Sequence, residues 1–216
     1  MASMTALWRR LDAPGHDACR LDEVEDGWRL HGTAVFGMDG AATRLDYRVD
    51  CDRGWCARTA SVDGWVGAQP IAIRIARDVA GGWLLDDVAV PALADCVDVD
   101  FGFTPATNVL QLRRVALAVG AAANVPVAWL DVPANTLERL EQRYHRLTDA
   151  TYGYEASWEV QGQIPRLAAL ARDDGSASFA RDDGSAALGR DAYHAVLETT
   201  PEGFARRYPG LWELEG

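Results

Sequence analysis

The sequence contains no lysine, and all 21 of its basic residues are arginines. The absence of lysine excludes Schiff-base catalysis and general-base catalysis by a lysine side chain. A bound anion would have to be held by arginine or by backbone N–H groups. A GC-rich coding sequence explains the missing lysine better than any function does, so only these exclusions follow from it.

Cysteine is also scarce, with four residues in 216: Cys19, Cys51, Cys56 and Cys96. They form no CxxC motif, and no histidine and cysteine residues have the spacing of a zinc site. Four cysteines in a chain of this length do not make a disulfide scaffold. Cys51 and Cys56 could still bridge two strand ends. We expect free thiols, no metal and no cofactor.

Long apolar segments are missing. No apolar run approaches the ~20 residues of a membrane-spanning helix, and the N-terminal stretch has no apolar segment of secretory length. The formal net charge of -11 argues against nucleic acids and anionic membrane surfaces as partners, because their phosphates would be repelled. We therefore expect a cytoplasmic protein without a nucleic-acid partner and without stable membrane insertion.

Common catalytic motifs are absent too. The sequence has no GxSxG elbow, P-loop, GxGxxG or HExxH motif, and its four histidines are scattered. A catalytic triad assembled in space remains open, although nothing in the sequence indicates one. The hydrophobic share of 49% is ample for a core, and the length is that of a single domain.

The dominant pattern is an alternation of apolar and polar residues with a period of two. It is clearest in residues 43–50 (TRLDYRVD), 69–77 (QPIAIRIAR) and 151–160 (TYGYEASWEV). Such alternation is typical of strands with one buried face. Turn signals such as MDGA, VDGW and AGGW separate the runs. The pattern predicts a mostly β protein with antiparallel neighbours.

One segment has a different period. In NTLERLEQRYHRLTD, Leu137, Leu140, Tyr144 and Leu147 recur at helical spacing, and Asn135 with Glu138 fits a capping box. The periodicity alone therefore predicts a helix here.

The stretch DVDFGFTPATNVLQLRR, residues 98–114, places charges among residues typical of buried strands. Asp98 and Asp100 are two residues apart and would share one strand face. Residues 102–108 contain turn-forming proline and asparagine. NVLQLRRVALAV then alternates weakly, with apolar residues on both faces, and predicts a second strand that is covered on both sides. Arg113 and Arg114 would point to opposite faces of it, and if the two strands pair, one of them can bind an aspartate across the ladder. The pair could fix the strand register, or the arginine could hold a ligand.

The same stretch resembles a bacterial family of glycolipid-binding proteins, formerly a domain of unknown function. Further matches are GWRLHGTAVF, YRVDCDRGWCAR, VAWLDVP, LEQRYHRL with YGYEASW, and RRYPGLW, so the resemblance extends from about Trp8 to Trp212. It implies a single strongly curved antiparallel sheet, a half-barrel similar to that of lipoprotein carriers, with a few short helices. Under that fold LEQRYHRL is a strand, and we prefer this expectation to the helix.

The sequence departs from the family pattern near its C-terminus. Residues of about 164–192 look inserted, and they include a tandem duplication in which ARDDGSASF is followed by ARDDGSAAL. Asp-Asp-Gly-Ser is typical of turns, and the spacing of a calcium loop is missing. We expect residues 1–216 to form one domain with this insert as a surface hairpin or loop.

The resemblance implies a function: non-catalytic binding of a hydrophobic or glycolipid-like small molecule in the concave face of the sheet. Polar and aromatic side chains would hold the head group. Each also has an ordinary structural role, in a cross-strand ion pair or in the core, which is favoured for any single residue. The candidate ligand-binding residues are Arg58, Asp98, Asp100, Asn108, Arg113, Arg114, Gln142, Tyr144 and Tyr154.

Two alternatives stay open. The chain could be an enzyme acting on an apolar or glycosylated metabolite in the same cavity, with Asp98, Asp100 and Glu155 as acid or base. It could instead be a scaffold that binds other proteins through a sheet edge or the insert, and an oligomer is possible. A carboxylate without an arginine partner in a cavity would favour the enzyme.

Overall fold

The computed structural model describes residues 2–157 and 193–215, and these form one large open β-sheet with a single α-helix. The first six strands are long and follow one another as antiparallel neighbours. They are β1 (Ser3–Arg10), β2 (Gly15–Val24), β3 (Gly27–Met38), β4 (Ala41–Asp52), β5 (Ala57–Val66) and β6 (Gln69–Arg77). The expectation of a mostly β, antiparallel-dominated fold is confirmed.

The remaining elements are shorter, except for β12. They are β7 (Trp83–Leu85), β8 (Val88–Ala89), the 3₁₀ turn η1 (Pro91–Leu93), β9 (Asp98–Phe101), α1 (Asn108–Val115), β10 (Ala122–Asn124), β11 (Val127–Asp131), β12 (Thr136–Arg146), β13 (Thr151–Ser157), β14 (Tyr193–Thr199), β15 (Ala205–Tyr208) and β16 (Trp212–Leu214). The inserted region expected at about 164–192 lies outside the described residues.

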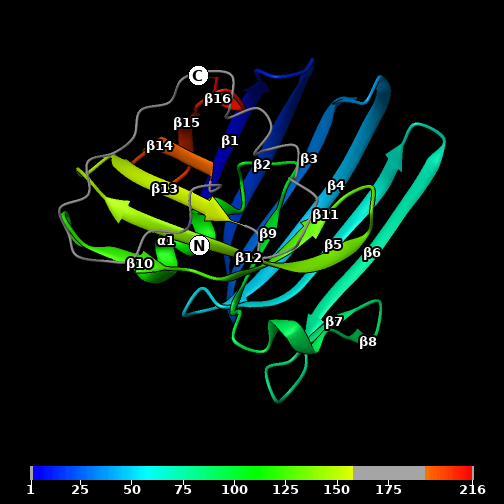
Figure 1. The fold of residues 1–216 in the computed structure, drawn as a ribbon, viewed down its shortest axis with the longest axis horizontal. Helices are drawn as coiled ribbons and strands as arrows, with labels where there is room; N and C mark the ends of the chain where they lie inside the picture. The colour runs from blue at the N-terminus through cyan, green and yellow to red at the C-terminus, as the bar shows by residue number, and fades with distance from the viewer. Residues whose placement is uncertain (1, 158–192, 216) are drawn as a thin grey trace.

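The two halves of the chain join through its terminal strands. β1 pairs with β16, so the order runs from β8 through β1 to β16 and on to β11 and β9. Figure 1 shows β1–β6 as one steep array, with β12 and β13 lying across it and α1 and β9 beside them. The sheet is therefore open and folded over on itself, and the N-terminal and C-terminal halves face each other across a shared interior.

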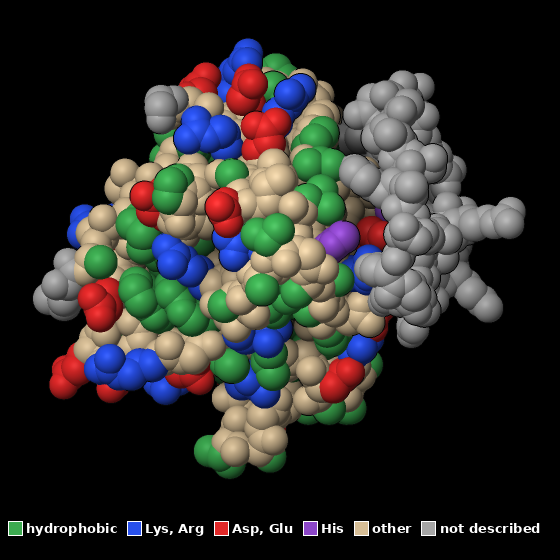
Figure 2. Space-filling model, turned by 90° about the vertical axis from the view of Figure 1, so that its left-hand side faces the viewer, with side chains coloured by type: hydrophobic (Ala, Val, Ile, Leu, Met, Phe, Trp, Pro, Cys, Tyr) green, Lys and Arg blue, Asp and Glu red, His purple; other side chains and the backbone are tan. Residues whose placement is uncertain are grey.

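The outer surface of the N-terminal strands carries paired charges. On β4, Arg44 bonds to Asp46 and Arg48 bonds to Asp50, because residues two apart share a strand face. In Figure 2, acidic, basic and hydrophobic side chains are intermixed over the face that it presents. Neighbouring opposite charges of this kind cancel locally, so the excess of acidic residues does not gather into one field on that face.

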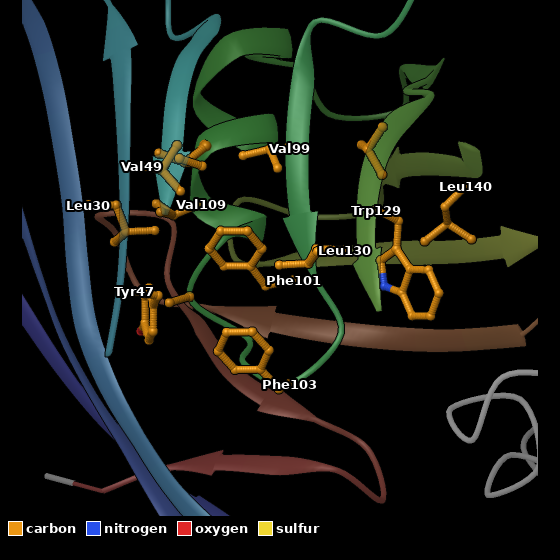
Figure 3. Packing of buried hydrophobic residues seen from close by; sticks show 14 of the residues in the cluster. Leu30, Tyr47, Val49, Val99, Phe101, Phe103, Val109, Trp129, Leu130 and Leu140 are labelled. Atoms are coloured by element: carbon orange, nitrogen blue, oxygen red, sulfur yellow. The ribbon is translucent and has the colours of Figure 1, made fainter. Parts of the chain in front are cut away.

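The core lies between the two halves of the sheet. Alternate residues of β4 and β6 face it, as the period of two predicts, and the alternation of TYGYEAS places Tyr152, Tyr154 and Ala156 inside. Phe101 and Phe103 stack with their ring centroids 5.4 Å apart. Tyr47 packs edge-on against both rings. Figure 3 shows these three rings between Leu30 of β3 and Trp129 of β11. Aromatic rings therefore fill the middle of the concave face.

The prediction of a second strand after residue 108 was wrong. Asn108–Val115 is an α-helix that is buried on nearly all sides through its first five residues. A short apolar run that is buried on both faces shows the same sequence pattern whether it forms a strand or a helix, so its periodicity does not distinguish the two. The helix ends at Ala116, whose φ of 43° places it in the left-handed region. The opposite-face argument for Arg113 and Arg114 therefore does not apply.

The helical periodicity of LEQRYHRL also predicted the wrong element, and the strand implied by the resemblance is confirmed. β12 is hydrogen-bonded to β11 and β10 on one side and to β13 on the other. Each residue from 136 to 146 pairs with at least one neighbouring strand, and residues 143–145 pair on both sides, so this tertiary pairing outweighs local periodicity. Among the described residues, no helix is long and apolar enough to cross a membrane.

Candidate binding site

A cavity opens at the end of the interior where β13–β16 approach the loop after β9. Its unfilled space is about 420 Å³, which includes open solvent at the mouth, and its enclosed part has room for about one water molecule. One wall is mainly aromatic: Tyr154, Tyr193, Tyr208 and Trp212. Polar groups also line the cavity: Asp100, Thr104 and Asn108. An aromatic wall with a few polar groups is typical of small-molecule sites.

Asp100 is held in the cavity wall by hydrogen bonds from neutral side chains. Its Oδ1 accepts from the Thr107 hydroxyl at 2.5 Å and its Oδ2 from the Gln142 amide at 2.8 Å. Burial raises the pKa of Asp100, and these two hydrogen bonds oppose that rise. Among the described residues, no cation is recorded as a partner of this carboxyl. Asp100 is therefore a buried carboxyl that also lines the cavity.

The hydrogen bonds continue behind the wall. The Asn108 amide donates to the Tyr144 hydroxyl at 2.9 Å, and that hydroxyl donates to the Gln142 carbonyl oxygen at 3.1 Å. Gln142 in turn donates to Asp100. Each donor and acceptor in the chain therefore has a fixed role, and the network holds the carboxyl of Asp100 in one orientation.

The tyrosines around the cavity form a connected cluster, which begins at Tyr144 of this network. The ring centroids of Tyr144 and Tyr154 are 5.1 Å apart, and those of Tyr193 and Tyr208 are 5.9 Å apart in a stacked arrangement. The ring of Tyr154 also contacts the rings of Tyr193 and Tyr208, which links the two pairs. Burial raises the pKa of Tyr144, Tyr154 and Tyr208 well above the ordinary value. These hydroxyls therefore stay protonated near neutral pH and can donate hydrogen bonds.

Asp98 has a different partner. The Arg114 guanidinium donates to both carboxyl oxygens, with Nε–Oδ1 at 2.9 Å and Nη2–Oδ2 at 2.6 Å. The Asp98 side chain is only 1% exposed and that of Arg114 is 23% exposed. The prediction that one of these aspartates pairs with one of the two arginines is borne out by this pair. The pair joins β9 to the last turn of α1, where a positive charge also suits the helix dipole.

A second uncharged environment surrounds Asp17, which the sequence analysis missed. Its carboxyl accepts from the Tyr47 hydroxyl at 3.0 Å and from the Thr104 hydroxyl. Burial raises the pKa of Asp17 to about 7, although both hydrogen bonds act to lower it. Alternation in HDACRL could have revealed this residue, because Asp17 has the same parity as the buried Cys19 and Leu21.

The structure brings together five of the nine candidate residues: Asp100, Asn108, Gln142, Tyr144 and Tyr154. The Asp98–Arg114 pair lies next to them, at the start of β9. Arg113 is turned away: its Nε donates to the Glu202 carbonyl at 2.8 Å, and its guanidinium lies 5.8 Å from the centroid of the Trp55 ring.

Arg58 is exposed on β5 and does not line the cavity. Tyr193, Tyr208 and Trp212 do line it, and the sequence analysis did not name them as candidates. RRYPGLW was noted only as a match to the family, which was the available signal for Tyr208 and Trp212.

The thiols and the acidic residues do not suggest a metal centre. All four cysteines are free, including Cys51 and Cys56. Within residues 2–157 and 193–215, no group of three or more histidine, cysteine, aspartate or glutamate side chains could hold a metal ion. What the arrangement can do chemically is to donate and accept hydrogen bonds beside aromatic rings.

Comparison with known proteins identifies relatives by sequence and by fold. The model of the family described as "Putative glycolipid-binding" matches residues 5–164. A DUF1089 family protein from Pseudomonas aeruginosa has a similar crystal structure, with a TM-score of 0.66 and 24% sequence identity over 99% of this chain and 92% of that one. At this identity the likeness shows the fold alone. No curated protein matches the chain.

Proposed function

Since the chain belongs to this glycolipid-binding family, we propose that its aromatic cavity binds the head group of a glycolipid-like small molecule and that it does so without catalysis. The observation that carries the proposal is that Tyr154, Tyr193, Tyr208 and Trp212 line the same cavity as Asp100. Aromatic faces pack against the C–H groups of a sugar ring, while a carboxyl and hydroxyls bond to its oxygens.

The size of the cavity limits how such a ligand is placed. The enclosed part admits a water molecule and little more, so a head group occupies the open mouth. Stacked Phe101 and Phe103 with Tyr47 fill the middle of the concave face, which leaves no room there for an acyl chain in this conformation. The apolar part of the ligand therefore extends from the mouth along Leu140 and Leu211 rather than through the core.

Two measurements test this proposal. Native mass spectrometry with lipid extraction, on protein purified from its own host, should reveal a bound amphiphile. Calorimetric titration with octyl β-D-glucoside below its critical micelle concentration should give saturable binding. Trp212→Leu should weaken it about tenfold, whereas Trp65→Leu should leave it unchanged, because Trp65 is 38% exposed on β5 and outside the cavity.

The folding of each variant is checked by its thermal melt. If Trp212→Leu melts much earlier than the parent, Tyr208→Phe provides a milder change in the same wall. No saturable binding by the parent protein and no extracted amphiphile would together refute the proposal.

One observation favours a second function. Asp100 lines the cavity without a described arginine partner, and its raised pKa suits a general acid. Glycoside hydrolysis normally needs two carboxyls flanking the bond. Asp100 is the only carboxyl among the described residues of the cavity wall. Binding is therefore the better supported function. If the protein hydrolyses nitrophenyl glycosides and Asp100→Asn abolishes this activity, catalysis would become the better supported function.

A further inference from the structure

The charges around the cavity allow the head group to be narrowed to a chemical class. Asp100 is the single ionisable residue other than tyrosine among the described residues of the wall. The tyrosines stay neutral because burial raises the pKa of Tyr154 and Tyr208. The wall therefore offers a carboxyl, an amide and hydroxyl groups, and no described cation.

The arginines that come near this region are already engaged. The guanidinium of Arg10 lies 5.5 Å from the ring centroid of Trp212, but Asp12 binds it through two hydrogen bonds of 2.6 and 2.8 Å. The guanidinium of Arg114 is bound by both oxygens of Asp98. A phosphate or carboxylate in the mouth would thus meet Asp100 without a described free positive charge to offset the repulsion.

The carboxyl of Asp100 retains capacity to accept further hydrogen bonds. An ionised carboxylate has about four lone-pair sites. The side chains of Thr107 and Gln142 occupy one site on each oxygen, and the backbone at Phe101 also contributes a hydrogen bond. A hydroxyl group of a ligand can use a remaining site, as sugar hydroxyls do with carboxylates.

From this arrangement, and resting on the proposed function, we propose that the cavity selects an uncharged, hydroxyl-bearing head group and rejects the same head group when it carries a negative charge. Asp100 is the selecting residue, because its carboxyl in the ionised form accepts a hydrogen bond from a hydroxyl and repels an anion at the same position. Like charges placed together at a poorly solvated site are strongly unfavourable for binding.

A matched pair of amphiphiles tests the selection. Octyl β-D-glucoside and octyl β-D-glucuronide share the tail and the sugar ring and differ by one carboxylate. Calorimetric titration at low ionic strength and pH 9, which favours the ionised form of a carboxyl whose pKa burial raises, should give a dissociation constant at least tenfold larger for the glucuronide. Asp100→Asn should reduce the difference to about threefold or less, because it removes the charge with little change in size.

A charge-matched control separates this effect from the general acidity of the protein. Asp149→Asn removes one negative charge from a side chain that is 97% exposed and outside the cavity, and should leave the discrimination as in the parent. If Asp100→Asn does not fold, the pH dependence of the parent serves instead: the discrimination should shrink as the pH falls, because burial raises the pKa of Asp100 and this carboxyl takes up a proton before an ordinary carboxylate does. Discrimination that does not change with pH would overturn the inference.

The possible outcomes distinguish the two proposals. If the protein binds neither amphiphile, this inference is overturned, and the proposed function fails as well if lipid extraction recovers no amphiphile. If it binds both with similar affinity, or prefers the glucuronide, the proposed function stands and the inference is overturned. Discrimination that persists unchanged in folded Asp100→Asn also overturns the inference, because another residue would then be responsible.

Discussion

Replacement of Arg114 should destabilise the protein far more than replacement of its neighbour Arg113. Arg114→Met keeps most of the aliphatic stem but leaves Asp98 buried without its guanidinium partner. Removing one member of a buried pair typically lowers the free energy of unfolding by about 3–5 kcal/mol. Because Arg114 is partly exposed, water can solvate the abandoned carboxylate in part, and we expect about 2–4 kcal/mol.

Arg113→Met is the matched control. That guanidinium donates to a backbone carbonyl and lies over the ring of Trp55. A hydrogen bond and a cation–π contact at a partly exposed site together contribute about 1 kcal/mol. The two neighbouring variants therefore undergo the same chemical change and should differ in unfolding free energy by at least about 1 kcal/mol.

The pH dependence provides a second test of the Arg114 prediction. Burial already raises the pKa of Asp98, and loss of the guanidinium removes the main opposing influence, so the pKa rises further in Arg114→Met. A raised native pKa means that the native state binds a proton at a pH where the unfolded state does not. Stability then increases as the pH falls through that window. The deficit of Arg114→Met should be largest at pH 7 and shrink toward pH 4.

Urea unfolding followed by tryptophan fluorescence measures both quantities, and equal slopes with denaturant would show that the variants unfold by the same transition. Equal destabilisation of the two variants at pH 7, or a deficit of Arg114→Met that does not change with pH, would refute the assignment of Arg114 as the partner of Asp98.

Two further predictions concern Asp17 and its surroundings. Burial raises the pKa of Asp17 to about 7, so the free energy of unfolding of the parent should fall as the pH rises from about 4 to 7. Asp17→Asn should remove on the order of a few kcal/mol of that fall, as measured by urea unfolding across the pH range. Gly32→Ala should destabilise by about 2–3 kcal/mol, as overpacking does, because a Cβ there would lie 2.4 Å from the Tyr47 hydroxyl oxygen and 2.6 Å from the Ala18 carbonyl oxygen. An unchanged thermal melt would contradict this expectation, because movement of the Tyr47 side chain alone does not relieve the contact with the Ala18 backbone.

Much of the sheet could be predicted from the sequence because alternation reflects a physical requirement. A strand with one buried face must place apolar side chains at every second residue, and TRLDYRVD and QPIAIRIAR do so along most of their length. The same rule failed at residues 108–115, where both faces are buried and the period carries no information. The strand order across β1 and β16 joins residues about 200 apart, and no local pattern encodes that pairing.

The candidate site was partly predictable for a similar reason. Asp98 and Asp100 stood out because charges are rare in buried strands. Their different roles could not be separated, because a strand at residues 108–114 would allow either arginine to pair with either aspartate, and the choice of Arg114 for Asp98 came with the helix. Tyr193 and Tyr208 come from β14 and β15, which reach the cavity through pairing with distant strands. Sequence spacing does not carry that information.

The buried carboxyls of the interior differ in the part of the structure that each one binds. Asp98 holds α1 through a charged pair. Asp17 and Asp100 instead bind hydroxyls of Thr104 and Thr107, which belong to the single loop between β9 and α1. Part of that loop lines the cavity. Hydrogen bonds to ionised carboxyls are stronger than those to neutral ones, so ionisation of these two acids tightens the loop while it increases the penalty of their burial. The buried polar residues therefore build and hold one wall of the cavity, and the aromatic core behind it can stay closed while a ligand binds at the mouth.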